Sequence, residues 1–191
     1  MKAEIIQKNI LSNKWGEYAE YEILYTRTDG KQEIQKREIQ DNGDGAAVLL
    51  YNLESQKILL LKQFRLATYV NGNESGIMTE VCAGLVENND PTYTIKKEIK
   101  EETGLDISEM TYLFQAFATP GAKTERIYFF IAQYHQEIVN GSSQGVLKEQ
   151  EDIILMEIPF SEAYEGIFTG KIQDSKTIIL LQYAKHYLFR D

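Results

Sequence analysis

Residues 77–105 narrow the possible folds of this chain more than any other segment. The apolar run IMTEVCAGLV predicts a short strand that reaches Gly84. After a polar loop, Asp90 and Pro91 suit the N-cap and the first position of a helix, and Gly104 suits the residue that ends it. The sequence therefore predicts a strand, a loop and a helix in direct succession, with the helix ending near Thr103.

The predicted helix carries three glutamates on one face. Glu98, Glu101 and Glu102 lie side by side because residues three and four positions apart share a helix face. In one interpretation they form an exposed face whose repulsion is relieved by Lys97 and Lys100. In the other, the carboxylates hold Mg²⁺, which prefers hard oxygen ligands. The preceding strand favours the second interpretation, because a strand end can aim a backbone carbonyl at the same point as helix carboxylates.

The composition excludes several classes of function. The formal net charge of −9 argues against a general nucleic-acid binder, and the two histidines give little material for a zinc site. The 29 Asp and Glu residues supply carboxylate chemistry better. No apolar run reaches about 18 residues, so no membrane partner is expected, and the N-terminus lacks the apolar core of a signal peptide. We expect a cytoplasmic protein in which the single Cys82 is a buried strand residue and not a nucleophile.

Turn and apolar patterns divide the rest of the chain. The Asp29-Gly30 turn predicts a hairpin within residues 18–39, which could also be an edge of the main sheet. The runs Ala46–Tyr51 and Ile58–Leu61 predict adjacent strands buried on both faces. The remaining expected segments are strands at 110–118, 126–134 and 152–160, helices at 161–168 and 175–189, a turn-rich stretch at 67–76 and a polar loop at 135–151.

Together these elements predict an α/β (α+β) fold in which a mixed β-sheet is sandwiched between helices. The turn sequence DNGDG marks a boundary. We expect an N-terminal antiparallel β-subdomain at residues 1–42 and a main domain at residues 43–191. The first of these contains too little apolar material for a core of its own and must therefore pack on something else.

The segment from Gly84 to Leu105 resembles the Nudix box, G-x5-E-x7-R-E-U-x-E-E-x-G-U, in which U is apolar. Gly84 matches the first glycine, and residues 98–105 match the whole second half. Lys97 replaces the arginine, Asp90 replaces the first glutamate, and the span from Gly84 to Lys97 is one residue shorter than the pattern. The motif arginine orients the glutamates, so the lysine leaves that role open. The resemblance implies the Nudix fold and hydrolysis of a nucleoside diphosphate linked to another group.

Other segments resemble one branch of this family. Pro120 lies fifteen residues after Leu105, as in the ADP-ribose pyrophosphatase branch, although Pro-Gly is also an ordinary turn. The segments YVNGNESG and CAGLVENND, with others from about Ile10 to the last helix, are similar to the GDP-mannose pyrophosphatases of that branch. Residues 136–148 are the least similar part.

This resemblance implies hydrolysis of GDP-mannose to GMP and mannose 1-phosphate. One alternative is an ADP-ribose or other nucleotide-sugar pyrophosphatase. An alternative of another class is a non-catalytic nucleotide-sugar sensor, against which the three retained glutamates argue. The resemblance also implies a homodimer whose N-terminal strands contribute to the partner's site.

The resemblance further implies a site for Mg²⁺, or for Mn²⁺ in its place. Its ligands correspond to the backbone carbonyl of Ala83 and the carboxylates of Glu98, Glu102 and Glu151. Glu101 is either a further ligand or a group that supports a ligand. Glu151 also corresponds to the general base, although an acid in KEQEDI is otherwise an ordinary exposed residue. These four glutamates are the expected catalytic residues.

Substrate contacts follow from the same resemblance. Lys36, Arg37 and Arg65 correspond to phosphate or sugar contacts, which suit the arginine fork, and Glu38 to a contact with base or sugar. Trp15 corresponds to an aromatic residue that stacks on the base, with a core or interface residue as the alternative. For the charged residues, ordinary exposure is the alternative. The other expected contacts are Ala83, Gly84, Leu85, Glu125, Gln150 and Lys176.

Overall fold

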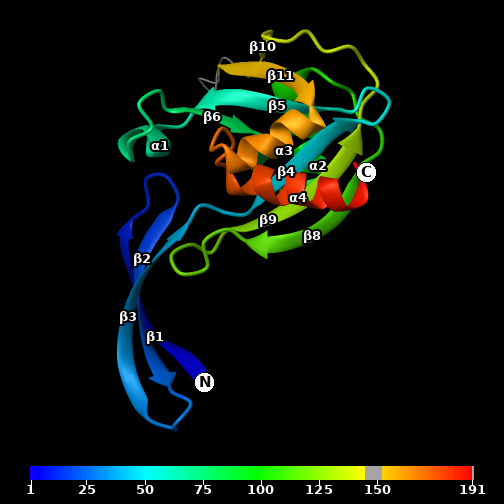
Figure 1. Cartoon of the computed structure of the whole chain (residues 1–191). Coiled ribbons are helices and arrows are strands. Elements are labelled where there is room, and N and C mark those ends of the chain that lie inside the picture. Colours follow the sequence, from blue (N-terminus) through cyan, green and yellow to red (C-terminus); the bar gives the residue numbers. More distant parts are fainter. Residues whose placement is uncertain (145–151, 191) are drawn as a thin grey trace. The chain divides into compact units, whose positions relative to one another are not determined.

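The computed structural model describes residues 1–144 and 152–190 (Figure 1). The chain groups into two compact units. The first consists of Met1–Asp44 and Gln115–Ile127, and the second of Gly45–Phe114 and Tyr128–Asp191. The boundary after residue 42 stays a prediction, and the first segment of the first unit ends close to it, at Asp44.

The first unit is built on an antiparallel sheet of β1 (Lys2–Ser12), β2 (Glu17–Thr26) and β3 (Gln32–Asp41). The Asp29-Gly30 turn joins β2 to β3, and Gly30 takes the left-handed φ of +82° that favours glycine. The predicted hairpin is therefore confirmed. It belongs to a separate three-stranded sheet and is not an edge of the main sheet.

Strand register shows which residues share a face of this small sheet, because directly paired residues point to the same side. One side, called the apolar face, carries Ile5, Lys8, Ile10, Tyr21, Ile23, Arg37 and Ile39. The other side, called the charged face, carries Gln7, Asn9, Glu20, Glu22, Leu24, Ile34, Lys36 and Glu38.

Residues 118–125 attach to β3 through Gln40. The N–H of Gln40 donates to the carbonyl of Ala122 over 2.9 Å, and the carbonyl of Gln40 accepts from the N–H of Thr124 over 3.1 Å. These contacts put the loop in the first unit, together with the N-terminal sheet.

Among the described residues, an eight-stranded sheet has the order β10-β11-β5-β4-β9-β8, with β6 paired to β5 and β7 paired to β4. Its strands are β4 (Gly45–Asn52), β5 (Lys57–Phe64), β6 (Ile77–Glu80), β7 (Cys82–Leu85), β8 (Thr111–Phe117), β9 (Arg126–Gln133), β10 (Ser143–Gln144) and β11 (Ile153–Pro159). The helices are α1 (Leu66–Val70), α2 (Pro91–Thr103), α3 (Phe160–Phe168) and α4 (Ser175–Tyr187). The strands expected at 46–51, 58–61, 110–118, 126–134 and 152–160 and the two C-terminal helices are therefore confirmed.

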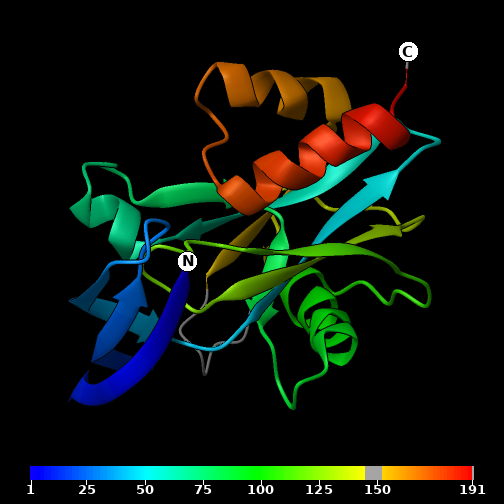
Figure 2. The ribbon, with the colours of Figure 1, turned by 90° about the horizontal axis from the view of Figure 1, so that it is seen from below.

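Helices cover both faces of this sheet in the second unit. Figure 2 shows α2 on one side of the strands and α3 and α4 on the other. Val48 and Leu50 of β4 pack with Ile95 of α2. Ala47 and Leu49, which alternate with them, are equally buried on the opposite face. The predicted mixed sheet between helices is confirmed, with β4 buried on both sides.

Both ends of α2 lie where the sequence predicts them. The carboxylate of Asp90 accepts hydrogen bonds from the N–H groups of Thr92 (3.0 Å) and Tyr93 (2.9 Å), and Pro91 begins the helix. Gly104 ends it with a left-handed φ of +74°. Asp90, which replaces a glutamate of the motif, therefore has a structural task as the N-cap.

Three segments differ from the sequence predictions. Residues 67–76 include part of α1, because the carbonyl of Arg65 accepts the hydrogen bonds that close a helical turn. The strand expected to reach Gly84 is two strands, β6 and β7, which are separated at Val81 and pair with different neighbours. The loop expected at 135–151 contains β10, which pairs with β11.

Two expectations from composition were also addressed by the structure. Cys82 is a buried residue of β7, as predicted. Within the described ranges, no helix has both the length and the apolar character needed to cross a membrane. The cytoplasmic location stays a prediction.

Candidate active site

The centre of the candidate site is formed by β7 and the middle of α2. The N–H of Ala83 donates to Oε2 of Glu102 over 3.2 Å, and Glu102 is only 2% exposed. Glu98 lies against Gly84, where an added Cβ would stand well within 3.0 Å of the Glu98 carboxylate. Gly84 has no left-handed φ, so the approach of Glu98, and not the backbone, requires glycine. Both carboxylates therefore converge on Ala83 and Gly84.

These groups fit a divalent cation of the Mg²⁺ type. Mg²⁺ prefers oxygen ligands and keeps several waters in its coordination shell. Glu98, Glu102 and the carbonyl of Ala83 are such ligands, and Gly84 leaves room for the Glu98 carboxylate beside the strand. In the described part of the chain, no group of three or more His, Cys, Asp or Glu residues could hold a metal. The side chains described here supply two carboxylates, which backbone and water oxygens would supplement.

Lys97, which replaces the arginine of the motif, pairs with two glutamates. Its Nζ donates to Oε1 of Glu87 over 2.8 Å and lies 3.4 Å from Oε2 of Glu101. The hydrogen bond to Glu87 is the main reason that the pKa of Lys97 is raised, so the ammonium stays charged. The ion pair between Lys97 and Glu101 favours a supporting role for Glu101 over direct metal binding.

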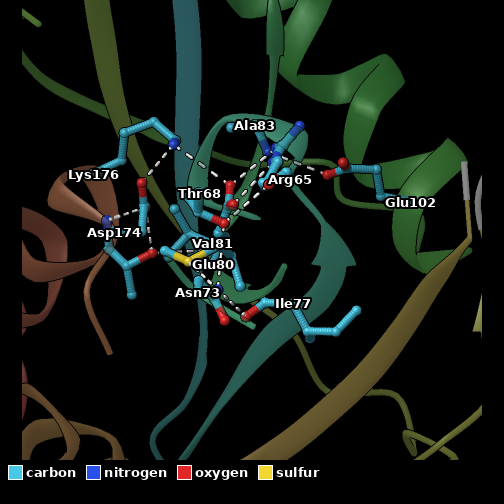
Figure 3. A network of polar contacts seen from close by, with 12 residues as sticks. Arg65, Thr68, Asn73, Ile77, Glu80, Val81, Ala83, Glu102, Asp174 and Lys176 are labelled. Carbon is cyan, nitrogen blue, oxygen red and sulfur yellow. Dashed lines mark hydrogen bonds and ion pairs between the residues drawn. The ribbon is translucent and has the colours of Figure 1, made fainter. Parts of the chain in front are cut away.

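Two expected substrate contacts, Arg65 and Lys176, meet at the carboxylate of Glu80 (Figure 3). Arg65 donates two parallel hydrogen bonds, from Nε to Oε1 and from Nη2 to Oε2, each 2.9 Å long. Nζ of Lys176 lies 3.5 Å from Oε2 of the same carboxylate. Glu80 is 3% exposed at the end of β6, whereas Arg65 follows β5 and Lys176 belongs to the first turn of α4. We call Arg65 and Lys176 the cation pair.

Asp174 extends these contacts to the start of α4, where it is the N-cap. Its Oδ1 accepts from Nζ of Lys176 over 2.7 Å, and its Oδ2 accepts from the N–H and hydroxyl of Thr177 over 2.9 and 2.7 Å. The Thr177 hydroxyl accepts from the N–H of Val81 over 2.9 Å. This network fixes the backbone between β6 and β7, two residues before Ala83.

Arg65 is an electrostatic neighbour of Glu102 in α2. Burial lowers the pKa of Arg65, but the hydrogen bonds to Glu80 and the charges of Glu80, Glu102 and Asp174 raise the pKa by more. The contribution of Glu102 links Arg65 to the candidate metal site.

Trp15 and Glu125 belong to the first unit. Trp15 lies between β1 and β2 and is 77% exposed, which rules out the alternative of a core residue. The carboxylate of Glu125 lies 4.0 Å from Nζ of Lys123, and its backbone carbonyl accepts from the N–H of Ala118 over 3.0 Å. The backbone contact fixes the loop end that carries Glu125.

Three consecutive expected contacts on β3 do not face the same way. Lys36 and Glu38 lie on the charged face, where Nζ of Lys36 is 3.3 Å from the carboxylate of Glu20 and the Tyr18 hydroxyl donates to Glu38. Arg37 lies on the apolar face. A single ligand on one side of this sheet would therefore meet only part of the set.

Three expected residues remain, namely Leu85, Gln150 and Glu151. Leu85 ends β7 and is exposed. Gln150 and Glu151 lie outside the described residues. The expected general base is therefore a prediction from the resemblance alone.

Sequence reasoning missed Glu80, Asp174 and Thr177. Glu80 had a signal, because it is a lone acid in an apolar strand, and a charged residue at a buried position needs a partner. Asp174 also had one, because it precedes the expected helix start at Ser175 and suits an N-cap. Neither signal names the partners, which come from distant segments.

Comparisons with known proteins identify the family of this chain. Residues 41–177 match the family model described as NUDIX domain. The GDP-mannose pyrophosphatase of Enterobacter sp. (strain 638) is 46% identical over 185 residues, which cover 97% of this chain and 96% of that protein. The GDP-mannose pyrophosphatase of Escherichia coli O139:H28 (strain E24377A / ETEC) is 46% identical over 183 residues, covering 95% and 94%.

A solved structure has the same fold. The crystal structure of an ADP compounds hydrolase covers 99% of this chain and 95% of its own, with a TM-score of 0.71 at 12% identity. At that identity the likeness concerns the fold alone. Because the family model spans most of the chain and the two relatives nearly all of it, the protein belongs to the Nudix domain family.

Proposed function

We propose that the protein hydrolyses the pyrophosphate bond of a nucleoside diphosphate sugar, with GDP-mannose as the substrate. The observation that carries this proposal is the convergence of Glu98 and Glu102 on Ala83 and Gly84 at the start of the Nudix box. Similarity over nearly the whole chain to GDP-mannose pyrophosphatases supports the choice of substrate. The chemistry supplied by bound Mg²⁺ would be charge neutralisation of the diphosphate and a lower pKa for a bound water.

The chain's own residues divide the remaining tasks. Glu98, Glu102 and the Ala83 carbonyl hold the metal. The cation pair binds phosphate oxygens, because an arginine fork and a lysine ammonium both suit them. Trp15 is proposed to stack on the base and Glu38 to contact the base or sugar. Lys36 and Arg37, which lie on opposite faces of β3, are proposed phosphate or sugar contacts, and Glu125 is proposed to position the substrate or a water.

Hydrolysis forms one bond and breaks one. A water oxygen attacks one phosphorus of the diphosphate, and the bond from that phosphorus to the bridging oxygen breaks. The bridging oxygen leaves with the other phosphate, so the products are GMP and mannose 1-phosphate. Glu151 is proposed as the acceptor of the water proton, on the basis of the resemblance.

A substrate panel tests this proposal. GDP-mannose, ADP-ribose and ADP-glucose are incubated with Mg²⁺, Mn²⁺ or EDTA, and the products are separated by chromatography. We expect GDP-mannose to be hydrolysed fastest, to GMP and mannose 1-phosphate, with no turnover in EDTA. Faster turnover of ADP-ribose or ADP-glucose would replace the substrate, and binding without hydrolysis of any compound would favour the sensor.

We also propose a homodimer formed through the first unit. Every residue of β1 is exposed in the single chain, and Ile5 and Ile10 lie on the apolar face. Contiguous exposed apolar side chains mark interaction surfaces. In this proposal the N-terminal strands of each protomer contribute to the site of the partner, as in the resembling family.

A further inference from the structure

Glu80 is a buried acid that the resemblance does not assign to any role. Its side chain is 4% exposed. A carboxylate removed from water is stable only when its charge is matched and its oxygens are hydrogen-bonded. Both oxygens meet this condition, because Arg65 binds Oε1 and Oε2 and Lys176 lies near Oε2.

The two cations are more accessible than the acid that joins them. The side chain of Arg65 is 41% exposed and that of Lys176 is 21% exposed. Contacts to Glu80 use Nε and Nη2 of Arg65, and a guanidinium carries further N–H donors on both Nη atoms. Within the described contacts, Arg65 therefore keeps donors for a ligand while Glu80 holds it from the buried side.

The same short stretch of chain connects Glu80 to the candidate metal site. Val81 and Cys82 separate Glu80 from Ala83, whose N–H donates to Glu102. The N–H of Val81 is held by Thr177, the neighbour of Lys176 in α4. A shift of Glu80 would therefore move the cation pair relative to the carboxylate of Glu102 in the candidate metal site.

We propose that Glu80 is a positioning residue, whose buried carboxylate holds Arg65 and Lys176 at a fixed spacing so that together they bind the diphosphate of the substrate. This inference rests on the proposed function. Two long cationic side chains that are already ordered lose less freedom on binding. Without the acid between them, the two positive charges would repel each other and separate. Asp174 also holds Lys176, so the loss of Glu80 should affect Arg65 more strongly.

The first test is Glu80→Gln, which keeps the size of the side chain, removes its charge and turns an amide N–H toward the donors of Arg65. With Mg²⁺ and GDP-mannose, we expect KM to rise roughly tenfold while kcat changes less than about threefold, because the cation pair acts in binding. A lost structural role would instead lower the melting temperature and kcat without moving KM.

A double-mutant cycle shows whether Glu80 acts through Arg65. In an Arg65→Ala background, we expect Glu80→Gln to change KM less than about twofold, because coupled residues are not additive. The matched control is Glu157→Gln. Glu157 also accepts hydrogen bonds from two side chains, Lys57 and Tyr134, each over 2.8 Å. The KM of the Glu157→Gln variant should equal that of the wild type.

If Glu80→Gln does not fold, Glu80→Asp is the second variant to test. Glu80→Asp keeps the charge but cannot reach both cations, so KM should rise by a smaller factor. Wild-type KM in the folded Glu80 variants, or the same rise in the Arg65→Ala background, would overturn the inference. A wild type that hydrolyses no sugar nucleotide would overturn the proposed function instead, and calorimetric binding of GDP-mannose would then take the place of KM.

Discussion

At the residue scale, a neighbouring side chain leaves room only for glycine at position 84. The Glu98 carboxylate occupies the space that a Cβ on Gly84 would need, and the φ of Gly84 lies outside the left-handed region. Glu102, one helical turn after Glu98, is buried and accepts from the N–H of Ala83. Both acids of α2 therefore lie against β7, Glu98 beside Gly84 and Glu102 at the N–H of Ala83.

Gly84→Ala should damage turnover more than stability. The new methyl group would displace the flexible end of Glu98, and a misplacement of about 1 Å at a reacting centre can slow an enzyme on the order of 100-fold. We expect kcat to fall about 10- to 100-fold with Mg²⁺, with a nearly unchanged melting temperature. Gly121→Ala is the control, because no heavy atom lies within 4 Å of its added Cβ. Wild-type turnover in Gly84→Ala would contradict this reading of the contact.

Glu102→Gln tests the metal assignment. The amide oxygen can still accept from the N–H of Ala83, but the negative charge that a Mg²⁺ ligand provides is lost. We expect kcat to fall at least about 100-fold, because even partners outside the metal ligands are worth about 10- to 100-fold. Glu101→Gln should lose less, because Glu101 pairs with Lys97. Full Mg²⁺-dependent turnover in Glu102→Gln would show that Glu102 is not a metal ligand.

At the scale of elements, α2 was predictable because its signals are local. Asp90 binds N–H groups two and three residues away, and Gly104 ends the helix through its own φ. The break between β6 and β7 at Val81 was not predictable. It depends on pairing with two different strands and on the hydroxyl of Thr177, which lies 96 positions further along the chain.

The same distinction applies to the candidate site. Helical spacing alone puts Glu98 and Glu102 on one face of α2, and the strand before it suggests where they point. The meeting of Arg65 and Lys176 at Glu80 could not be read from any pattern, because it needs β5, β6 and α4 to be packed together. The resemblance supplied those two cations but not the acid that joins them.

Asp90→Ala should weaken the fold and spare the chemistry. Removing an N-cap acceptor lowers the free energy of unfolding by about 1 kcal/mol, which corresponds to about 2–4 °C in melting temperature for a chain of this size. Thermal unfolding followed by circular dichroism measures the shift, and turnover at 25 °C should stay near the wild-type value. Asp90→Asn keeps an acceptor and should melt close to the wild type. An equal loss in both variants would contradict the capping role.

At the scale of the whole molecule, the sheet of the first unit has two unlike faces. Ile5, Ile10 and Ile23 lie on the apolar face, and β1 is exposed along its whole length in the single chain. Lys36 and Glu38 lie on the charged face. The proposed homodimer would use the apolar face, and the proposed contacts of Lys36 and Glu38 with the substrate would use the charged face.

Sedimentation velocity tests the proposed homodimer. We expect the wild type to sediment with twice the chain mass of 22.0 kDa. Ile5→Lys combined with Ile10→Lys should shift it to the monomer, because buried charges would repel across the apolar face. The control adds the same charges to the other face of β1, as Gln7→Lys with Asn9→Lys, and should remain dimeric. A wild-type monomer, or equal dissociation by both double variants, would contradict the proposal.

The closeness of Glu98 to Gly84 has a consequence for how such a chain diverges. Asp90 and Gly104 serve the helix and stay useful to any descendant that keeps the fold. The missing side chain at position 84 leaves room for the carboxylate beside it. In a gene copy released from hydrolysis, alanine at position 84 would cost little in folding, because the atoms it displaces belong to a flexible side chain. Such an alanine would therefore record the loss of catalysis even while all three glutamates of the helix persisted.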